Sequence, residues 1–292
     1  MGPSPPTLFC FGLGYTALAL AGPLLREGWR IAGTCRTAEH QAALAARGIT
    51  AHVLARGRPL ADPAAAFAGV THILSSVPPD DAGDPVLDEH GADLARLAGI
   101  AWVGYLSTTG VYGGRAGGWV DEGSALAPTG ERGRRRLAAE RGWLALWQPH
   151  GLPVHLFRLA GIYGPGRNAL ESLRNGTAKR VVKPGQVFSR IHVDDIVQVL
   201  RASMARPNPG AAYNVCDDNP APPAEVIEYA AELLGIAPPP AMPFDQAELS
   251  AMARSFYEDN KRVRNDRLKR ELGVTLRYPD YRVGLQAILA RR

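Results

Sequence analysis

Short apolar runs alternate along the chain with longer segments in which apolar residues recur every three or four positions. Short runs between turn residues are typical of buried strands, and the longer repeat is typical of helices. The strand-like runs span residues 8–12, 29–34, 52–54, 71–77, 101–106, 154–159 and 213–215. The helical segments span residues 38–47, 63–68, 86–97, 128–140, 196–204, 224–234, 246–253, 265–272 and 283–290. Since strands alternate with helices, we predict right-handed βαβ units and an α/β fold on a doubly wound parallel sheet.

The first strand-like run leads into a glycine-rich turn, Gly12-x-Gly14-x-x-Ala17, and then into a helical repeat. In a dinucleotide-binding turn the first glycine permits the sharp bend, the second lets the backbone approach a pyrophosphate, and the small third residue allows close helix packing. The N–H groups at the start of the helix then face the phosphates. An ordinary strand-to-helix turn is the alternative interpretation.

The end of the second strand bears on the choice of cofactor. An NAD-binding unit places an Asp or Glu about 20 residues after the glycine turn, where it binds the ribose hydroxyls. Here that place holds Thr34, Cys35, Arg36 and Thr37. Because arginine can bind a 2′-phosphate through its planar fork, the sequence favours NADP over NAD, although a solvated loop arginine is the alternative.

The composition excludes several classes of protein. At 292 residues the chain is long enough for one or two domains, and 46% of its residues are hydrophobic and 21% charged. No apolar run approaches the roughly 18 residues of a membrane span, and residues 1–6 lack a signal-peptide profile. We expect a cytoplasmic protein without membrane contacts. The three cysteines have no paired spacing, so we expect neither disulfides nor a metal site.

The formal charge of +5 is too small and too dispersed to indicate nucleic-acid binding. One dense basic cluster comprises Arg132, Arg134, Arg135 and Arg136. It is either a solvated helix face or a wall that attracts an anionic cofactor or substrate.

Several motifs follow one another in the order seen in extended short-chain dehydrogenase/reductases, the NAD-dependent epimerase/dehydratase group. They are the glycine turn and the segments 106–113, 158–166, 190–195 and 213–215. The closing segments 265–273 and 278–281 are similar to the tail of the atypical members of that family. The resemblance covers nearly the whole chain and implies a Rossmann-like domain, a smaller and mainly helical C-terminal substrate domain, and a homodimer. We place the NADP-binding domain at residues 1–160 plus about 186–216, and the substrate domain at about 161–185 plus 217–292.

The resemblance also assigns site residues. Thr108 takes the place of the family's catalytic Ser/Thr, which holds the substrate oxygen. The implied cofactor contacts are Gly12, Gly14, Tyr15, Thr16, Arg36, Thr37, Ser76, Val77, Ser107, Ala160 and Ile162. The implied substrate contacts are Thr109, Tyr163 and Arg190. The basic run at 179–183 would suit an anionic small-molecule substrate, or it is a plain solvated loop. Asp194 or Asp195 is expected to cap the following helix, at residues 196–204, rather than to bind metal.

The chain departs from the family at the Tyr-x-x-x-Lys pair of the active-site helix. Aligning Glu140 with the family's glutamate places Arg136 at the lysine and Arg132 at the tyrosine. Arg136 keeps the positive charge and can hold a ribose or phosphate, whereas Arg132 cannot transfer a proton, because its pKa is above about 12. Tyr112, four residues after Thr108, is either a substitute acid/base or a residue packed under the loop.

Three hypotheses follow. The first is an NADP-dependent oxidoreductase or epimerase acting on a small polar or nucleotide-linked substrate. The second is a catalytically inactive NADP-binding sensor or regulatory protein that lost the Tyr-x-x-x-Lys pair. The third, a nucleic-acid binder using the arginine cluster, is disfavoured because no aromatic platforms accompany the arginines.

Overall fold

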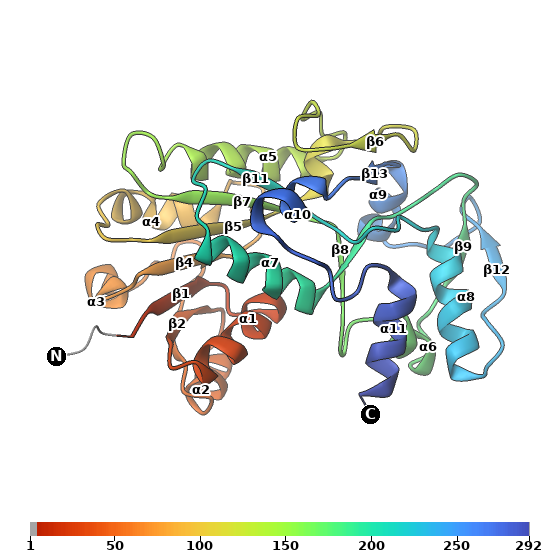
Figure 1. The fold of residues 1–292 in the computed structure, drawn as a ribbon, viewed down its shortest axis with the longest axis horizontal. Helices are drawn as coiled ribbons and strands as arrows, with labels where there is room; N and C mark the ends of the chain where they lie inside the picture. The colour runs from red at the N-terminus through yellow and green to blue at the C-terminus, as the bar shows by residue number, and fades with distance from the viewer. Residues whose placement is uncertain (1–4, 292) are drawn as a thin grey trace. The chain divides into compact units, whose positions relative to one another are not determined.

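The computed structural model describes residues 5–291, apart from the side chains of residues 251 and 252. A seven-stranded sheet runs through it in the order β11-β7-β5-β4-β1-β2-β3 (Figure 1). The strands are β1 (Thr7–Phe11), β2 (Arg30–Cys35), β3 (Thr50–Val53), β4 (His72–Ser75), β5 (Trp102–Thr108), β7 (Val154–Leu159) and β11 (Ala212–Val215). Neighbouring strands from β3 to β5 pair in parallel. The predicted α/β, Rossmann-like parallel sheet is confirmed, and its strand order reverses between β1 and β4.

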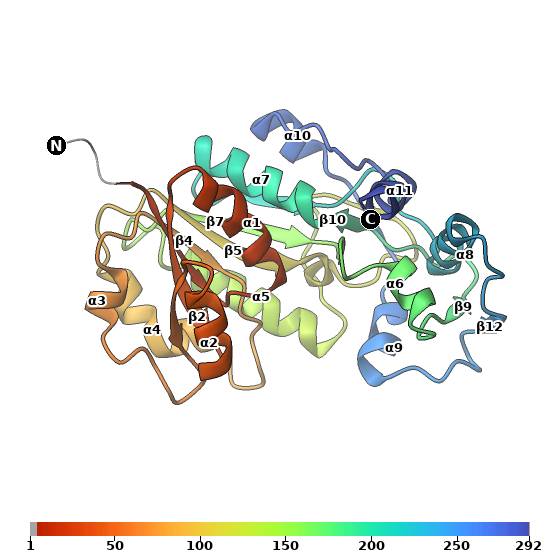
Figure 2. The ribbon, with the colours of Figure 1, turned by 90° about the horizontal axis from the view of Figure 1, so that it is seen from below.

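The helices around this sheet are α1 (Tyr15–Arg26), α2 (Ala38–Ala45), α3 (Pro63–Phe67), α4 (Pro85–Ala95), α5 (Glu131–Leu144) and α7 (Val193–Ala205). Figure 2 shows α1 and α5 on opposite sides of the sheet. Trp143 of α5 and Leu94 of α4 pack against buried strand residues such as Phe9 and Tyr105. Among the described residues, no helix is long and apolar enough to cross a membrane.

Two strands of the sheet approach each other closely at one glycine. A β-carbon on Gly33 of β2 would lie 2.2 Å from the carbonyl oxygen of Cys10 in β1. Only glycine therefore allows β2 to pair with β1 in this register, in which Gly33 faces Cys10. This pairing brings the end of β2 beside the glycine turn that follows β1.

The chain forms two compact units, which we describe separately. Unit 1 comprises Met1–Ser107, Arg134–Arg158 and Leu200–Tyr213, and unit 2 comprises Thr108–Gly133, Leu159–Val199 and Asn214–Arg292. The division into an NADP-binding and a substrate domain at the boundaries given above stays a prediction.

Unit 2 contains three small parallel strand pairs and a helical cluster. The strands are β6 (Trp119–Val120), β8 (Gly161–Tyr163), β9 (Arg180–Val182), β10 (Arg190–His192), β12 (Ala241–Pro243) and β13 (Arg262–Val263), and a 3₁₀ turn spans Thr109–Tyr112. The helices are α6 (Ala169–Arg174), α8 (Pro223–Leu234), α9 (Ala251–Glu258), α10 (Asp266–Leu272) and α11 (Tyr281–Ala290). In Figure 1, α8 and α11 lie side by side. Their buried residues, including Ala230 and Leu285, form a core of their own.

One predicted helix is displaced. The helix expected at 246–253 begins only at Ala251, because the hydroxyl of Ser250 accepts a hydrogen bond from the N–H of Ala253 and caps the helix there. The preceding residues form turns instead, in which the N–H of Gln246 donates to the carbonyl of Pro243. Just before these turns, residues 241–243 form the short strand β12, which pairs with β9.

Candidate functional site

The glycine turn of unit 1 is held by the ends of two neighbouring strands. Gly12 has a φ of 84°, and its N–H donates to the hydroxyl of Thr34 at 2.9 Å. Directly after β4, the hydroxyl of Ser76 donates to the carbonyl of Gly12 at 2.6 Å. A β-carbon on Gly12 would lie 2.9 Å from that hydroxyl and 3.2 Å from Val77, so the turn requires glycine for its own packing. Ser76 and Val77, both predicted cofactor contacts, are half-buried against the turn.

Gly14 differs from Gly12, because nothing in the protein crowds it. It is exposed, its φ is −95°, and a β-carbon there would meet no atom within 4 Å. Gly14 begins α1, whose N-terminus has no side-chain cap and whose first turn holds no acidic residue. Tyr15 is half-buried there and Thr16 is buried. The helix therefore presents a positive N-terminus, next to an open glycine, which suits an anion.

The end of β2 carries the predicted 2′-phosphate residues. Arg36 is exposed, and among the described residues it has neither an ion-pair nor a hydrogen-bond partner. The hydroxyl of the next residue, Thr37, accepts a hydrogen bond from the N–H of His40 and caps α2. An unpaired guanidinium on a helix-capping loop is available to an external anion.

A buried polar network that the sequence did not predict joins β5, α5 and β7 in unit 1. The hydroxyl of Ser107 donates to Glu140 at 2.5 Å. The guanidinium of Arg158 donates to the same carboxylate, with a contact of 2.9 Å from Nη2 to Oε2. Glu140 and Arg158 are 2% and 5% exposed. Ser107, predicted to contact the cofactor, thus gives its hydroxyl hydrogen to Glu140.

Arg136 is also anchored at the end of β5. Its guanidinium donates to the carbonyl of Leu106 at 2.6 Å and to the hydroxyl of Tyr105 at 3.3 Å. Burial raises the pKa of Tyr105, and the positive charge of Arg136 opposes that shift. In the same cluster Arg135 forms an ion pair with Asp81, while Arg134 is exposed. The arginine cluster is therefore partly solvated and partly engaged in unit 1.

In unit 2, β5 ends at Thr108, and the 3₁₀ turn after it carries Thr109 and Tyr112. Thr108 is half-buried and accepts a hydrogen bond from the N–H of Gly110, and Thr109 is half-buried beside it. Tyr112 is fully buried, and its hydroxyl donates to the side-chain oxygen of Asn214 at 2.7 Å. Of the two roles considered for Tyr112, this placement favours packing under the loop.

Behind Tyr112, the backbone N–H of Asn214 donates to the carboxylate of Glu122 at 2.7 Å. Burial raises the pKa of Glu122. The phenol of Tyr112 thus contacts the side chain of Asn214, and the backbone of Asn214 contacts the half-buried Glu122.

The remaining predicted residues of unit 2 lie on and beside β8 and β10. Ala160 is buried and Ile162 half-buried. The hydroxyl of Tyr163 donates to the carbonyl of Asp280 at 3.3 Å. Arg190 donates through Nη1 to two backbone carbonyls, of Phe188 and Ala221, at 2.9 Å each.

Arg190 lies near a buried carboxylate, Asp217, that no sequence pattern predicted. Asp217 is 1% exposed, and neither of its carboxylate oxygens has a hydrogen-bond partner among the described residues. Burial raises the pKa of Asp217, and the charge of Arg190 opposes the shift. The segment reads Cys216-Asp217-Asp218, and nothing in that pattern distinguishes a buried acid from an exposed one.

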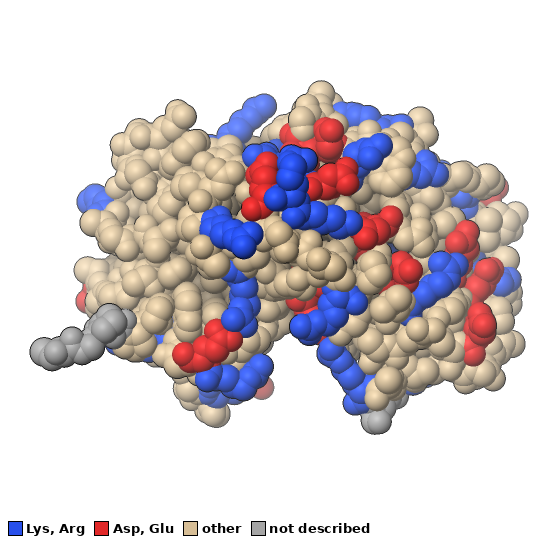
Figure 3. Space-filling view, viewed as in Figure 1, with Lys and Arg blue, Asp and Glu red and all other residues tan. Residues whose placement is uncertain are grey.

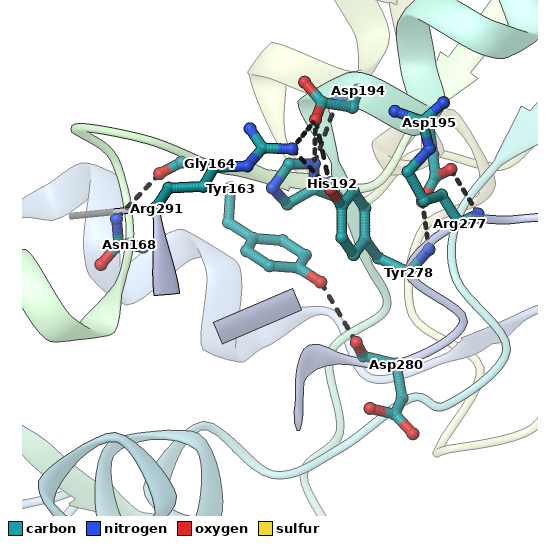
Figure 4. A network of polar contacts seen from close by, with 10 residues as sticks. All are labelled: Tyr163, Gly164, Asn168, His192, Asp194, Asp195, Arg277, Tyr278, Asp280 and Arg291. Carbon is teal, nitrogen blue, oxygen red and sulfur yellow. Dashed lines mark hydrogen bonds and ion pairs between the residues drawn. The ribbon is translucent and has the colours of Figure 1, made fainter. Parts of the chain in front are cut away.

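The prediction that Asp194 or Asp195 caps α7 from outside is wrong. Both residues lie within the first turn of α7. Their carboxylates hold the C-terminal segment instead, as Figure 4 shows. Asp195 accepts from the N–H groups of Arg277 and Tyr278 at 2.8 and 3.0 Å, and Asp194 pairs with Arg291 at 2.8 Å. In the described part of the chain, no group of three or more His, Cys, Asp or Glu residues is arranged to hold a metal ion.

A charged recess of about 350 Å³ lies between α10 and the turn after β6, within unit 2. Acidic and basic side chains alternate along it, which Figure 3 shows as interleaved red and blue. Many of these charges pair with one another, for example Arg267 with Glu271 at 3.0 Å. The recess contains none of the predicted site residues. Its lining is Asp121, Glu122, Gly123, Arg264, Asp266, Arg267, Arg270 and Glu271.

Comparison with known proteins gives three informative matches besides a family model. The model of the NAD dependent epimerase/dehydratase family matches residues 91–216. Protein YeeZ of Escherichia coli K12 is 28% identical over 284 residues, which cover 92% of this chain and 95% of YeeZ. The solved structure of a functionally unknown conserved protein from Silicibacter pomeroyi is 56% identical, with a TM-score of 0.91, and the match covers 98% of this chain and 99% of that one.

The third match shows the fold alone. It is dTDP-glucose 4,6-dehydratase from Bacillus anthracis in complex with NAD, which is 18% identical with a TM-score of 0.76. The match covers 98% of this chain and 96% of that chain.

Proposed function

The chain belongs to the NAD-dependent epimerase/dehydratase family of extended short-chain dehydrogenase/reductases, and on that premise we propose that it is an NADP-dependent oxidoreductase or epimerase. We propose a small, polar, nucleotide-linked substrate. The substrate class is supported by the name of the structurally similar dTDP-glucose 4,6-dehydratase, which was solved with NAD.

The observation that carries the proposal is the open space at Gly14. The protein's own packing explains why residue 12 is glycine, but nothing within 4 Å explains why residue 14 is. A β-carbon there would project into the space before the uncapped N-terminus of α1. Since a pyrophosphate must come close to this backbone in a dinucleotide site, its approach supplies the missing reason for glycine.

Arg36 supports NADP over NAD. No acidic residue follows β2 at the place where NAD-binding chains bind the ribose hydroxyls, and Arg36 stands there exposed and unpaired among the described residues. Thr37 adds a hydroxyl beside it. Together they are suited to bind a 2′-phosphate.

The chemistry that a bound nicotinamide supplies is the transfer of a hydride to or from a substrate carbon. The residues of the chain bind and orient the reactants. We assign Thr108 to hold the substrate oxygen, and Arg190 to attract an anionic group of the substrate. Arg136, fixed on the carbonyl of Leu106, keeps a permanent positive charge at the end of β5.

The first experiment is a thermal-shift titration with NADPH and NADH on wild-type protein and on Arg36→Asp. Selective binding to the folded state raises stability by about 2.7 kcal/mol at a hundredfold excess over the dissociation constant. We expect NADPH to shift the wild type more than NADH does, and R36D to lose at least about tenfold in NADPH affinity, or 1.4 kcal/mol. Arg47→Asp, at another exposed arginine of unit 1, is the control.

An unchanged NADPH-to-NADH ratio in R36D would contradict the NADP assignment, and no shift with either nucleotide would contradict the whole proposal. Turnover is then sought with oxidised NADP and dTDP-glucose or UDP-glucose as probes, by nicotinamide absorbance for an oxidoreductase and by product analysis for an epimerase, which leaves no net change in the cofactor. Binding of NADPH with no turnover of these or other nucleotide-linked probes would favour the catalytically inactive alternative.

A further inference from the structure

The place of the missing tyrosine in the active-site helix lies beside the loop that carries Thr108. A β-carbon on Gly133, in the first turn of α5, would lie 2.7 Å from the carbonyl oxygen of Gly110. Arg132, at the tyrosine's place, is exposed, and its guanidinium lies 5.0 Å from the ring centre of Phe256. The segment that starts at Phe256 therefore reaches the first turn of α5 within unit 2.

That segment continues to a buried lysine. The chain has four lysines, Lys179, Lys183, Lys261 and Lys269, and all lie in the described part of the structure. Only Lys261 is buried, with its side chain 9% exposed. A lysine is seldom buried without a reason, because its ammonium loses hydration.

The residues around Lys261 bind its ammonium group and also shift its pKa. Nζ donates to Asp259 at 3.0 Å, and the other oxygen of Asp259 accepts from the hydroxyl of Thr129 at 2.6 Å. Burial lowers the pKa of Lys261, the charge of Asp259 opposes this, and Arg115 lowers it further. Thr129 lies just before α5, so this chain of contacts connects Lys261 to the start of the active-site helix.

The backbone around Lys261 is held from two other loops of unit 2. The N–H groups of Arg115 and Gly117 donate to the carbonyl of Asn260 at 2.8 and 2.9 Å. The side-chain amide of Gln186 donates to the carbonyl of Asp259 at 2.8 Å. Lys261 is thus fixed where the loop after Tyr112, the approach to α5 and the segment after β9 meet.

We propose that Lys261 is the catalytic acid/base of this chain, exchanging the proton of the substrate's reacting oxygen in place of the absent tyrosine. The inference rests on the proposed function. A lysine can perform this role because, unlike arginine, it can lose its proton near neutral pH once its pKa is lowered. Asp259 positions the amine.

The proposed step balances with oxidised NADP as the hydride acceptor. A bound nicotinamide would supply the acceptor for the C–H electron pair of an alcohol substrate. The O–H proton passes to the neutral amine of Lys261, and the O–H electron pair becomes the second bond of the carbonyl. In the reverse direction the Lys261 ammonium returns the proton to the oxygen as hydride adds to the carbon.

The test uses the whole protein labelled with ¹³C-lysine, in which four Cε signals report the ionisation of four amines. Lys261→Arg identifies the Lys261 signal by its loss. We expect this signal to titrate below the usual range of a lysine amine, whose pKa is about 10.4. We also expect NADPH with dTDP-glucose or UDP-glucose to move the Lys261 signal and leave the Lys269 signal in place.

Two outcomes separate this inference from the proposed function. If thermal shift shows that NADPH and a probe bind, but the Lys261 signal does not respond or titrates in the usual range of a lysine amine, the inference is wrong and the proposed function stands. If no nucleotide binds, the proposed function is wrong and this inference with it.

Kinetic variants add a readout that a structural role would not move. For a probe that is turned over, we expect K261R to lower kcat by 10²- to 10⁴-fold with NADPH affinity unchanged, as is typical of a lost acid/base. K269R should keep its activity. Adding Arg132→Tyr to K261R restores a phenol at the family's position and should recover part of kcat, and a K261R protein with wild-type kcat and pH profile would overturn the proposal.

Discussion

The protein's own packing does not explain why residue 14 is glycine. Gly12 has a positive φ, and a β-carbon at this position would clash with Ser76. Gly14 has an extended backbone, and a β-carbon there would meet open space. A larger side chain at 14 should therefore fold without cost and block only what approaches from outside. This asymmetry distinguishes a binding glycine from a packing glycine.

We predict that Gly14→Val leaves the free energy of unfolding within about 0.5 kcal/mol of the wild type, as is usual for exposed sites, but weakens NADPH at least about tenfold. Urea denaturation and calorimetric titration measure the two quantities. Gly12→Val is the matched comparison and should lose stability, because it adds a clash and a strained φ. Undiminished NADPH affinity in G14V would argue against a pyrophosphate at this turn.

The sequence could least predict which side chains of the candidate site form hydrogen bonds and ion pairs with each other. The spacing of Gly12 and Gly14 is a local signal and predicted the turn, since a strand, a bend and a helix follow within a few residues. Thr129 and Asp259, by contrast, are 130 positions apart, and their contact depends on tertiary packing. Neither periodicity nor a motif therefore predicted Lys261 as a site residue, although the structure shows that it is buried.

The network of Ser107, Glu140 and Arg158 joins two neighbouring strands of the sheet to α5. In the sequence, Glu140 served only to align that helix, and Arg158 only as part of a family motif. In the structure, the carboxylate accepts from both other residues in a nearly solvent-free place. The end of β5 therefore owes its position to a buried ion pair as well as to backbone pairing.

We predict that Glu140→Gln destabilises the protein by about 3 to 5 kcal/mol, because Arg158 keeps its charge in a buried place and loses the opposite charge. Urea denaturation of the variant and the wild type measures the difference. Glu131→Gln, at an exposed position on the same helix, should stay within about 0.5 kcal/mol. A loss below about 1 kcal/mol in E140Q would mean that water reaches Arg158.

The bounds of helices and strands were predicted best where the periodicity was strong. They were predicted worst where a capping hydrogen bond sets the first residue of a helix. The strand at 154–159 coincides with β7, and the helix at 224–234 differs from α8 by one residue. The spacing of small and apolar residues suggested a helix from 246, yet the side chain of Ser250 sets its start at Ala251. A cap is a single hydrogen bond, and several residues of that segment could have supplied it.

The C-terminal segment is fastened to α7 around a buried histidine, as Figure 4 shows. His192 is fully buried between the rings of Tyr163 and Tyr278, and its Nδ1 accepts from the N–H of Asp194 at 3.1 Å. Burial lowers the pKa of His192 to about 4, with the carboxylate of Asp194 opposing and Arg291 and Arg277 adding to the shift. In the unfolded chain the same imidazole has a pKa of about 6.5.

This difference predicts how the stability of the folded chain depends on pH. Between about pH 6.5 and pH 4 the unfolded chain binds a proton at residue 192 that the folded chain excludes, so acidification favours unfolding there, by up to about 1.4 kcal/mol per pH unit. Above that window the histidine is neutral in both states and adds no slope. Urea denaturation at several pH values, on wild type and His192→Gln, isolates the effect, because other groups titrate equally in both proteins. The stability difference between H192Q and wild type should grow in favour of H192Q as the pH falls from 6.5 to 4; parallel curves would show that the folded chain admits the proton.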